Sequence, residues 1–221
     1  MHHGARTIAV EAGWRLQKIL RAQRYFTTPE LVRLYKSHVL SYVEGGTPAY
    51  FHASASTLSC IDRVQRRFLR AIGISEEEAL LNFRLAPLPT RRCIAILGLL
   101  HRVVLGNVSA QIAEIFPRAS VRSVPDAIAE RVRGRSRHDK QLFDRVDARS
   151  SEQFKRSAFG MVQCYNALPQ SAVDILSVKS SQRNLQLALM AGVRRGHEDW
   201  QSLFQEGRRY ASLIQFQRFF D

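Results

Sequence analysis

Four arginines recur at helical spacing between residues 57 and 72, a segment whose apolar pattern predicts a helix. They follow i, i+3, i+4 and i+7 and therefore share one side of that helix: Arg63, Arg66, Arg67 and Arg70. The apolar residues share the other side: Ile61, Val64, Phe68 and Ile72. Since a guanidinium group grips phosphate through paired hydrogen bonds, such a helix can lie across a phosphate backbone, with Gln65 adding a polar contact. A solvated outer face that keeps the protein soluble explains the pattern equally well.

A second basic segment, residues 14–26, contains neither Gly nor Pro and alternates apolar with basic residues at helical spacing. Its candidate phosphate contacts are Arg15, Lys18 and Arg21. Its aromatic residues are of a type that stacks on nucleic-acid bases. At helical spacing, however, aromatic residues are more often part of a core, and we favour that interpretation for Trp14, Tyr25 and Phe26.

The whole chain is strongly basic. Its 221 residues include 33 Lys and Arg against 19 Asp and Glu, a formal net charge of +14. Most of the positive charge comes from arginine, which binds phosphate bidentately and stacks on bases. The excess favours polyanionic partners, with nucleic acid first and an acidic membrane surface second. A generally arginine-rich composition is the alternative explanation.

The sequence offers no arrangement typical of a catalytic or metal centre. It contains no Asp-Asp pair that would hold two metal ions, and we interpret Asp139, Asp144 and Asp147 as solvated partners of nearby basic residues. Its three cysteines, at positions 60, 93 and 164, are too far apart for a zinc ligand pair. No phosphate loop or nucleophile elbow is present. We therefore expect no enzymatic activity, no metal, no cofactor and no small-molecule substrate.

The same features bear on the compartment. Residues 1–20 lack the continuous apolar run of a signal peptide. No apolar run in the sequence reaches the roughly 18 residues that a membrane span needs. An odd number of scattered cysteines suits free, mostly buried thiols in a reducing environment. We expect an intracellular protein, nuclear or cytoplasmic, without a membrane span, and the oligomeric state stays open.

Periodicity and capping signals predict an all-α protein with no strand pair. Thr27 with Glu30 and Ser75 with Glu78 have the spacing of capping boxes. In chain order the predicted helices span residues 14–26, 28–43 (with Leu31, Leu34, Tyr35, His38 and Tyr42 on one face), 57–72, 76–86, 90–105, 110–116, 152–166, 171–176, 180–195 and 198–215. We expect a helical bundle at 1–117, a basic linker or mobile loop at 118–150, and a smaller C-terminal helical segment at 151–221.

Four short motifs follow one another along the chain. Residues 34–39 read Leu-Tyr-Lys-Ser-His-Val, residues 64–67 Val-Gln-Arg-Arg, residues 85–92 Leu-Ala-Pro-Leu-Pro-Thr-Arg-Arg, and residues 165–169 Tyr-Asn-Ala-Leu-Pro. In this order they resemble the thumb and following segment of non-LTR (LINE-type) retrotransposon reverse transcriptases. The resemblance covers most of residues 14–195.

This resemblance implies a thumb-like helical bundle, which in polymerases packs against the template–primer duplex. The family's catalytic Y-x-D-D motif has no counterpart here, so the resemblance implies descent from a polymerase without polymerisation. The leading hypothesis is a non-catalytic remnant that binds RNA or DNA weakly through the phosphate backbone, without sequence preference. The alternatives are a helical protein-interaction scaffold, a gene-model product without selected function, and a fragment of an active RNA-directed DNA polymerase.

Overall fold

The computed structural model describes residues 2–119, 138–147, 149–198 and 200–204. Within these ranges 70% of residues are helical and no strand is present, which confirms the predicted all-α class. A single isolated antiparallel bridge joins Arg118 and Leu142 in the described part. The chain divides into two compact units, Met1–Arg92 (unit 1) and Cys93–Asp221 (unit 2). The boundary between these units falls inside helix α7 (Leu88–Val104).

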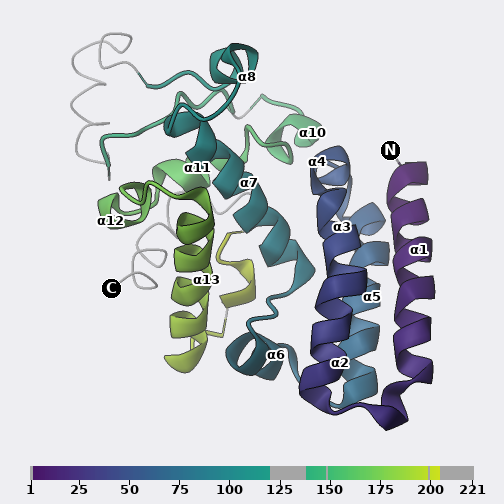
Figure 1. The fold of residues 1–221 in the computed structure, drawn as a ribbon. Coiled ribbons are helices and arrows are strands. Elements are labelled where there is room, and N and C mark those ends of the chain that lie inside the picture. Colours follow the sequence, from purple (N-terminus) through teal and green to yellow (C-terminus); the bar gives the residue numbers. More distant parts are fainter. Residues whose placement is uncertain (1, 120–137, 148, 199, 205–221) are drawn as a thin grey trace. The chain divides into compact units, whose positions relative to one another are not determined.

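Unit 1 is built around two long helices that pack side by side, α1 and α5 (Figure 1). They run parallel, because the Cys60 thiol lies 3.9 Å from the Ala5 carbonyl near their starts and the Gln23 amide donates to the Ala71 carbonyl near their ends. In order the elements are α1 (His2–Arg21), a 3-10 turn (Gln23–Tyr25), α2 (Thr28–Tyr35), a π-helical turn (Lys36–Leu40), α3 (Ser41–Gly45), α4 (Thr47–Tyr50), α5 (Ala55–Ile72) and α6 (Glu76–Phe83).

Helix α1 differs from the prediction at both ends. It begins at His2 instead of residue 14 and stops at Arg21 instead of residue 26. The earlier part was missed because Gly4 and Gly13 lower the local helix propensity. Ala5 and Ala12 are buried, and their small side chains let the helix approach its neighbours closely. This packing offsets the lower helix propensity.

Both predicted capping boxes are confirmed. The backbone N–H of Thr27 donates to the Glu30 carboxylate at 2.8 Å, and that of Ser75 donates to Glu78 at 2.7 Å. The Thr27 backbone and side chain hold the pKa of Glu30 below its ordinary value. Helix α5 ends at Gly73, whose φ of 72° is left-handed and suits a residue without a Cβ.

The π-helical turn Lys36–Leu40 corrects the predicted face of the helix that leads to Val43. A π turn inserts one extra residue and so shifts the register of everything after it. Leu31 and Tyr35 are buried as predicted, but His38 is exposed and Leu34 and Tyr42 are only partly covered. The core positions after the shift are Val39, Leu40 and Val43.

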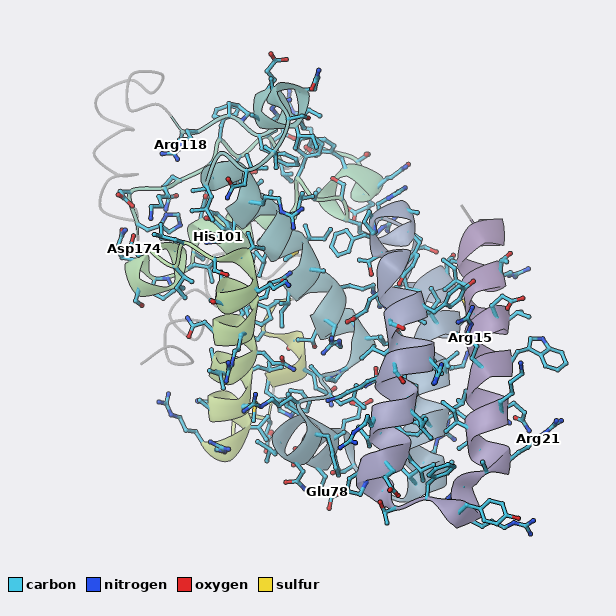
Figure 2. The ribbon with its side chains drawn as sticks, viewed as in Figure 1. Arg15, Arg21, Glu78, His101, Arg118 and Asp174 are labelled. Atoms are coloured by element: carbon cyan, nitrogen blue, oxygen red, sulfur yellow. The ribbon has the colours of Figure 1, made fainter. Side chains whose placement is uncertain are left out.

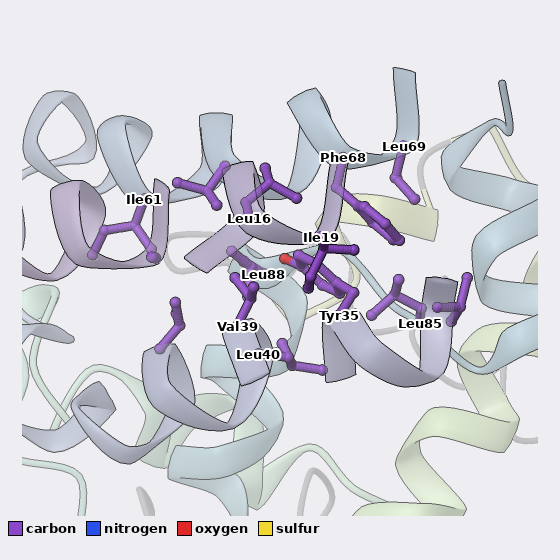
Figure 3. Close-up of a cluster of buried hydrophobic side chains, with 14 of the residues drawn as sticks. Leu16, Ile19, Tyr35, Val39, Leu40, Ile61, Phe68, Leu69, Leu85 and Leu88 are labelled. Carbon is purple, nitrogen blue, oxygen red and sulfur yellow. The ribbon is translucent and has the colours of Figure 1, made fainter. Parts of the chain in front are cut away.

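The core of unit 1 centres on an aromatic pair. The rings of Tyr35 and Phe68 stack with centroids 4.2 Å apart and an interplanar angle of 6°. Figure 3 shows this pair among aliphatic side chains contributed by α1, the π-helical turn, α5 and the segment from Leu85 to Leu88. The Tyr35 hydroxyl is buried without a hydrogen-bond partner among the described residues, and burial raises its pKa. Tyr35 therefore contributes packing and not a polar contact.

We expect Tyr35→Phe to keep or raise the free energy of unfolding, by up to about 1–3 kcal/mol, because it removes a buried hydroxyl with no partner. Urea denaturation monitored by circular dichroism measures the change. Tyr50→Phe is the matched control, since the Tyr50 hydroxyl donates to the Val43 carbonyl at 2.7 Å. Its loss should cost about 0.5–1.5 kcal/mol. A larger loss for Tyr35→Phe than for the control would contradict the expectation.

Unit 2 contains most of α7, the equally long α13 and several short helices. The elements are α7 (Leu88–Val104), α8 (Ala110–Ile115), α10 (Glu152–Lys155), α11 (Met161–Asn166), α12 (Gln170–Val173), α13 (Val178–Arg194) and a 3-10 turn (Trp200–Ser202). The helix predicted at 152–166 is broken, because the chain folds back so closely at Gly160 that a Cβ would lie 1.7 Å from the Lys155 carbonyl oxygen. Of the helix predicted at 198–215, residues 205–215 lie outside the described residues.

The predicted linker 118–150 is described only at its ends. Its basic run, residues 131–137, lies outside the described residues. The described end is packed: Leu142 is 1% exposed, and the Asn166 side chain pairs with its backbone. The amide oxygen of Asn166 accepts from Leu142 N–H at 2.9 Å, and its nitrogen donates to the Leu142 carbonyl at 2.8 Å. Residues 138–147 therefore belong to unit 2.

Candidate nucleic-acid interface

All seven predicted phosphate contacts are exposed in unit 1. The four arginines of α5 lie opposite its buried stripe, as the sequence predicted; we name this set the arginine face: Arg63, Arg66, Arg67 and Arg70. None of the ion pairs found among the described residues uses any of these four.

The arginine face extends toward α1 through one hydrogen bond. Arg67 donates to the Gln17 side-chain carbonyl at 2.8 Å. Arg70 stays on its own helix and donates to the Arg66 carbonyl at 3.4 Å. On the other edge, Arg66 opposes the rise in the pKa of Glu76 that burial causes. The face is therefore bounded by α1 on one side and the acidic start of α6 on the other.

Gln65 does not belong to this face, which corrects the prediction. It is 3% exposed and points to the core side of α5. Its amide nitrogen donates to the Ala86 carbonyl at 3.1 Å, while its side-chain oxygen is buried with no hydrogen-bond partner among the described residues. At 100° per residue Gln65 follows Val64 on the buried side, so the helical periodicity already contained the signal.

The three basic residues predicted on α1 do not share one side. Arg15 turns toward the π-helical turn and α3: its guanidinium lies 4.1 Å from the centre of the Tyr42 ring and donates to the His38 carbonyl at 3.4 Å. Lys18 and Arg21 lie in the last turn of α1 and are exposed. Figure 2 shows Arg15 and Arg21 at different levels and on different sides of this helix. Arg15 is therefore separate from the arginine face.

The aromatic residues of the same segment are not in the core, so the interpretation favoured from the sequence is wrong. Trp14 is 63% exposed, Tyr25 69% and Phe26 42%. Trp14 lies opposite the buried side of α1, and Tyr25 and Phe26 come after the helix has ended. The Arg24 guanidinium lies 4.7 Å from the centre of the Tyr25 ring and donates to its hydroxyl at 2.6 Å.

Unit 2 contains a buried polar cluster that the sequence did not reveal. His101 is 1% exposed and places Nδ1 3.0 Å from the Tyr165 hydroxyl and Nε2 2.6 Å from the Ile175 carbonyl. His138 is 4% exposed and places Nε2 3.1 Å from the Tyr165 carbonyl, while Nδ1 accepts from the Lys140 N–H at 3.1 Å. Burial lowers the pKa of both histidines. No local spacing signals this cluster, because its members are far apart in the chain.

Carboxylates and thiols form no metal centre in the described part. No group of three or more His, Cys, Asp or Glu able to hold a metal ion occurs there. The three aspartates interpreted as salt-bridge partners instead accept hydrogen bonds: Asp139 from Gln170, Asp144 from the Val146 N–H and Asp147 from Ser150. None of the three cysteines forms a disulfide, and burial raises the pKa of the Cys164 thiol.

No protein-family model, curated protein or solved structure matches this chain. Within the residues described, no helix combines the length and the apolar character needed to cross a membrane. Any functional conclusion for this chain therefore depends on the geometry of its own surfaces.

Proposed function

We propose that this chain is a non-catalytic, thumb-like helical remnant of a non-LTR reverse transcriptase that binds nucleic acid through its phosphate backbone. The residues that carry the resemblance fall into two groups in the structure. Just over half are buried, among them Tyr35, Gln65, Leu85, Leu88, Tyr165 and Leu168. In the Val-Gln-Arg-Arg motif, the two arginines are exposed. This division supports an inherited helical scaffold that presents a basic surface.

One observation carries the binding proposal: α5 is buried on one side and presents four exposed arginines on the other. The buried side fixes the helix, so the arginine face is presented at fixed helical spacing. Arginines along one helix face meet phosphates more readily than base edges, so binding should be insensitive to sequence. Dissociation constants for non-specific binding of this kind are typically about 10⁻⁴–10⁻⁶ M at physiological salt.

We expect replacement of Arg63, Arg66, Arg67 and Arg70 by Gln to flatten the dependence of log K on log salt for duplex DNA, by up to about four units. Each phosphate contact releases about one counterion, so the change in slope between the native protein and the variant counts the contacts that were lost. Fluorescence anisotropy of a labelled duplex across a salt series measures it. Circular dichroism should show an unchanged fold, because the substitutions leave the buried side of α5 untouched.

The matched control removes four positive charges from exposed arginines of unit 2: Arg102, Arg149, Arg183 and Arg194, each to Gln. If the salt slope changes less in this control than in the α5 variant, the effect comes from the position of the arginine face and not from the loss of four positive charges. An unchanged slope in the folded α5 variant would show that the face is only a solvated surface, and the protein-interaction scaffold would then be the better proposal. Equal flattening by both variants would also count against the arginine face.

A further inference from the structure

The outer side of α1 interleaves an aromatic side chain with cations. Trp14, Lys18 and Arg21 follow i, i+4 and i+7 and are all exposed; we name these three the aromatic face. The opposite side of α1 is buried through Leu16 and Ile19. The helix is therefore anchored by one side and presents an indole and two cations on the other, spread over an axial rise of about 10 Å.

Beyond the end of α1, Tyr25 adds a second exposed ring. The Arg24 guanidinium covers part of this ring and hydrogen-bonds its hydroxyl, which fixes the ring without burying it. Tyr25 remains 69% exposed. A single exposed apolar residue is ordinary, but here two large exposed rings flank exposed cations along the sequence, at positions 14 and 25.

This chemistry distinguishes between partners. The cations require an anionic partner, and the exposed rings gain nothing from phosphates. A duplex keeps its base faces stacked inside the helix, whereas unpaired bases can stack on aromatic side chains. A membrane surface would require a broad apolar face, and the apolar side of α1 faces the core of unit 1.

We propose that the aromatic face together with Tyr25 binds single-stranded nucleic acid, with unpaired bases stacked on Trp14 and Tyr25 and phosphates held by Lys18 and Arg21. The inference rests on the proposed function and narrows its substrate class. The arginine face supplies additional backbone contacts, and its link to α1 is the hydrogen bond from Arg67 to Gln17. The strand would be bound without regard to sequence, since every base has a stacking face.

The test compares labelled oligothymidylate of about 20 nucleotides, longer than typical site sizes of roughly 4–16 nucleotides, with a duplex of equal length. Trp14→Ala and Tyr25→Ala should each weaken single-strand binding by about 5- to 150-fold, the range that base stacking supplies, and leave duplex binding unchanged. Trp14→Phe should retain most of the affinity because it keeps a stacking ring. Leu176→Ala, at an 80% exposed position of unit 2, should change neither.

Fluorescence gives a second readout. The chain has two tryptophans, and Trp200 is 2% exposed, so quenching by an added strand should come from Trp14. Oligothymidylate should quench the emission of the native protein but not that of Trp14→Phe.

Unchanged single-strand affinity in both alanine variants would overturn this inference, while a flattened salt slope in the α5 variant would still support the proposed function. Self-association that Trp14→Ala abolishes would also overturn it, by making the ring a contact between copies.

Discussion

Replacing Arg92 with alanine is expected to lower the free energy of unfolding of unit 1 by about 3–5 kcal/mol, the cost of breaking a buried ion pair from one side. Arg92 binds both carboxylate oxygens of Asp62, at 2.6 and 3.0 Å, with only 5% of the Arg92 side chain and 16% of the Asp62 side chain exposed. The substitution leaves the Asp62 charge largely buried without its partner. Urea denaturation measures the loss.

The neighbouring residue provides a matched control. Arg91 pairs with Glu44, but 23% and 39% of these side chains are exposed. Arg91→Ala should therefore cost no more than about 1 kcal/mol. The double variant Arg92→Ala, Asp62→Ala should recover part of the loss, because it leaves no buried charge behind. Equal losses for Arg91→Ala and Arg92→Ala would show that burial of the Arg92–Asp62 pair has no special energetic role.

This ion pair matters for the proposed interface because Asp62 precedes Arg63 on α5. The pair ties α5 to the first turns of α7, and so helps to hold the arginine face in place. Loss of binding in Arg92→Ala at temperatures where it remains folded would indicate that orientation of α5, and not only its charge, determines affinity. The salt slope should then stay steep, since all four arginines of that face are retained.

Unit 2 is expected to lose stability as the pH falls below about 6.5, the ordinary pKa of histidine. Each Nε2 faces a carbonyl oxygen, so that nitrogen carries the proton and Nδ1 accepts, from the Tyr165 hydroxyl in His101 and from the Lys140 N–H in His138. A second proton on either ring binds to Nδ1, which can then no longer accept its hydrogen bond. The geometry therefore agrees with burial in lowering the folded-state pKa of both groups.

The direction of this pH dependence follows from the linkage between proton binding and folding. The unfolded chain binds protons at a higher pH than the folded one, so the stabilisation is present above about pH 6.5 and is lost as the pH falls toward the folded pKa. Each histidine that charges only on unfolding adds up to about 1.4 kcal/mol per pH unit. Of the neighbouring charges, Lys140 lowers the pKa of both histidines, while Asp139 and Asp174 raise that of His138.

Trp200 reports this transition, since it is buried in unit 2 and a Trp14→Phe background leaves it as the one tryptophan of the chain. Denaturation followed through its emission between pH 7 and about pH 5 stays above the ordinary range of the carboxylates. His101→Gln and His138→Gln should flatten the pH dependence, and His38→Gln, at an exposed position of unit 1, should not. The prediction fails if the histidine-to-glutamine variants of unit 2 retain the native pH dependence.

Features that depend on neighbours within a few residues could be predicted from the sequence. The capping boxes at Thr27 and Ser75 were predictable because side chain and backbone meet three residues apart. The two-sided pattern of α5 was predictable because one helical period sorts its arginines from Ile61 and Phe68. These local rules were enough for the all-α class and for the exposure of the arginine face.

The burial of several other residues depends on contacts with distant segments and could not be predicted in this way. Trp14 has helical spacing typical of a core residue, yet the side of α1 that packs is the one carrying Leu16 and Ile19. The side of α5 on which Gln65 lies follows from the helical periodicity, but its acceptor is a carbonyl 21 residues away, and His101 meets a tyrosine 64 residues away. Burial of a polar group depends on whether a distant segment supplies its hydrogen-bond partner. No pattern within one helix contains that information, so the aromatic face and the histidine cluster emerged only from the folded chain.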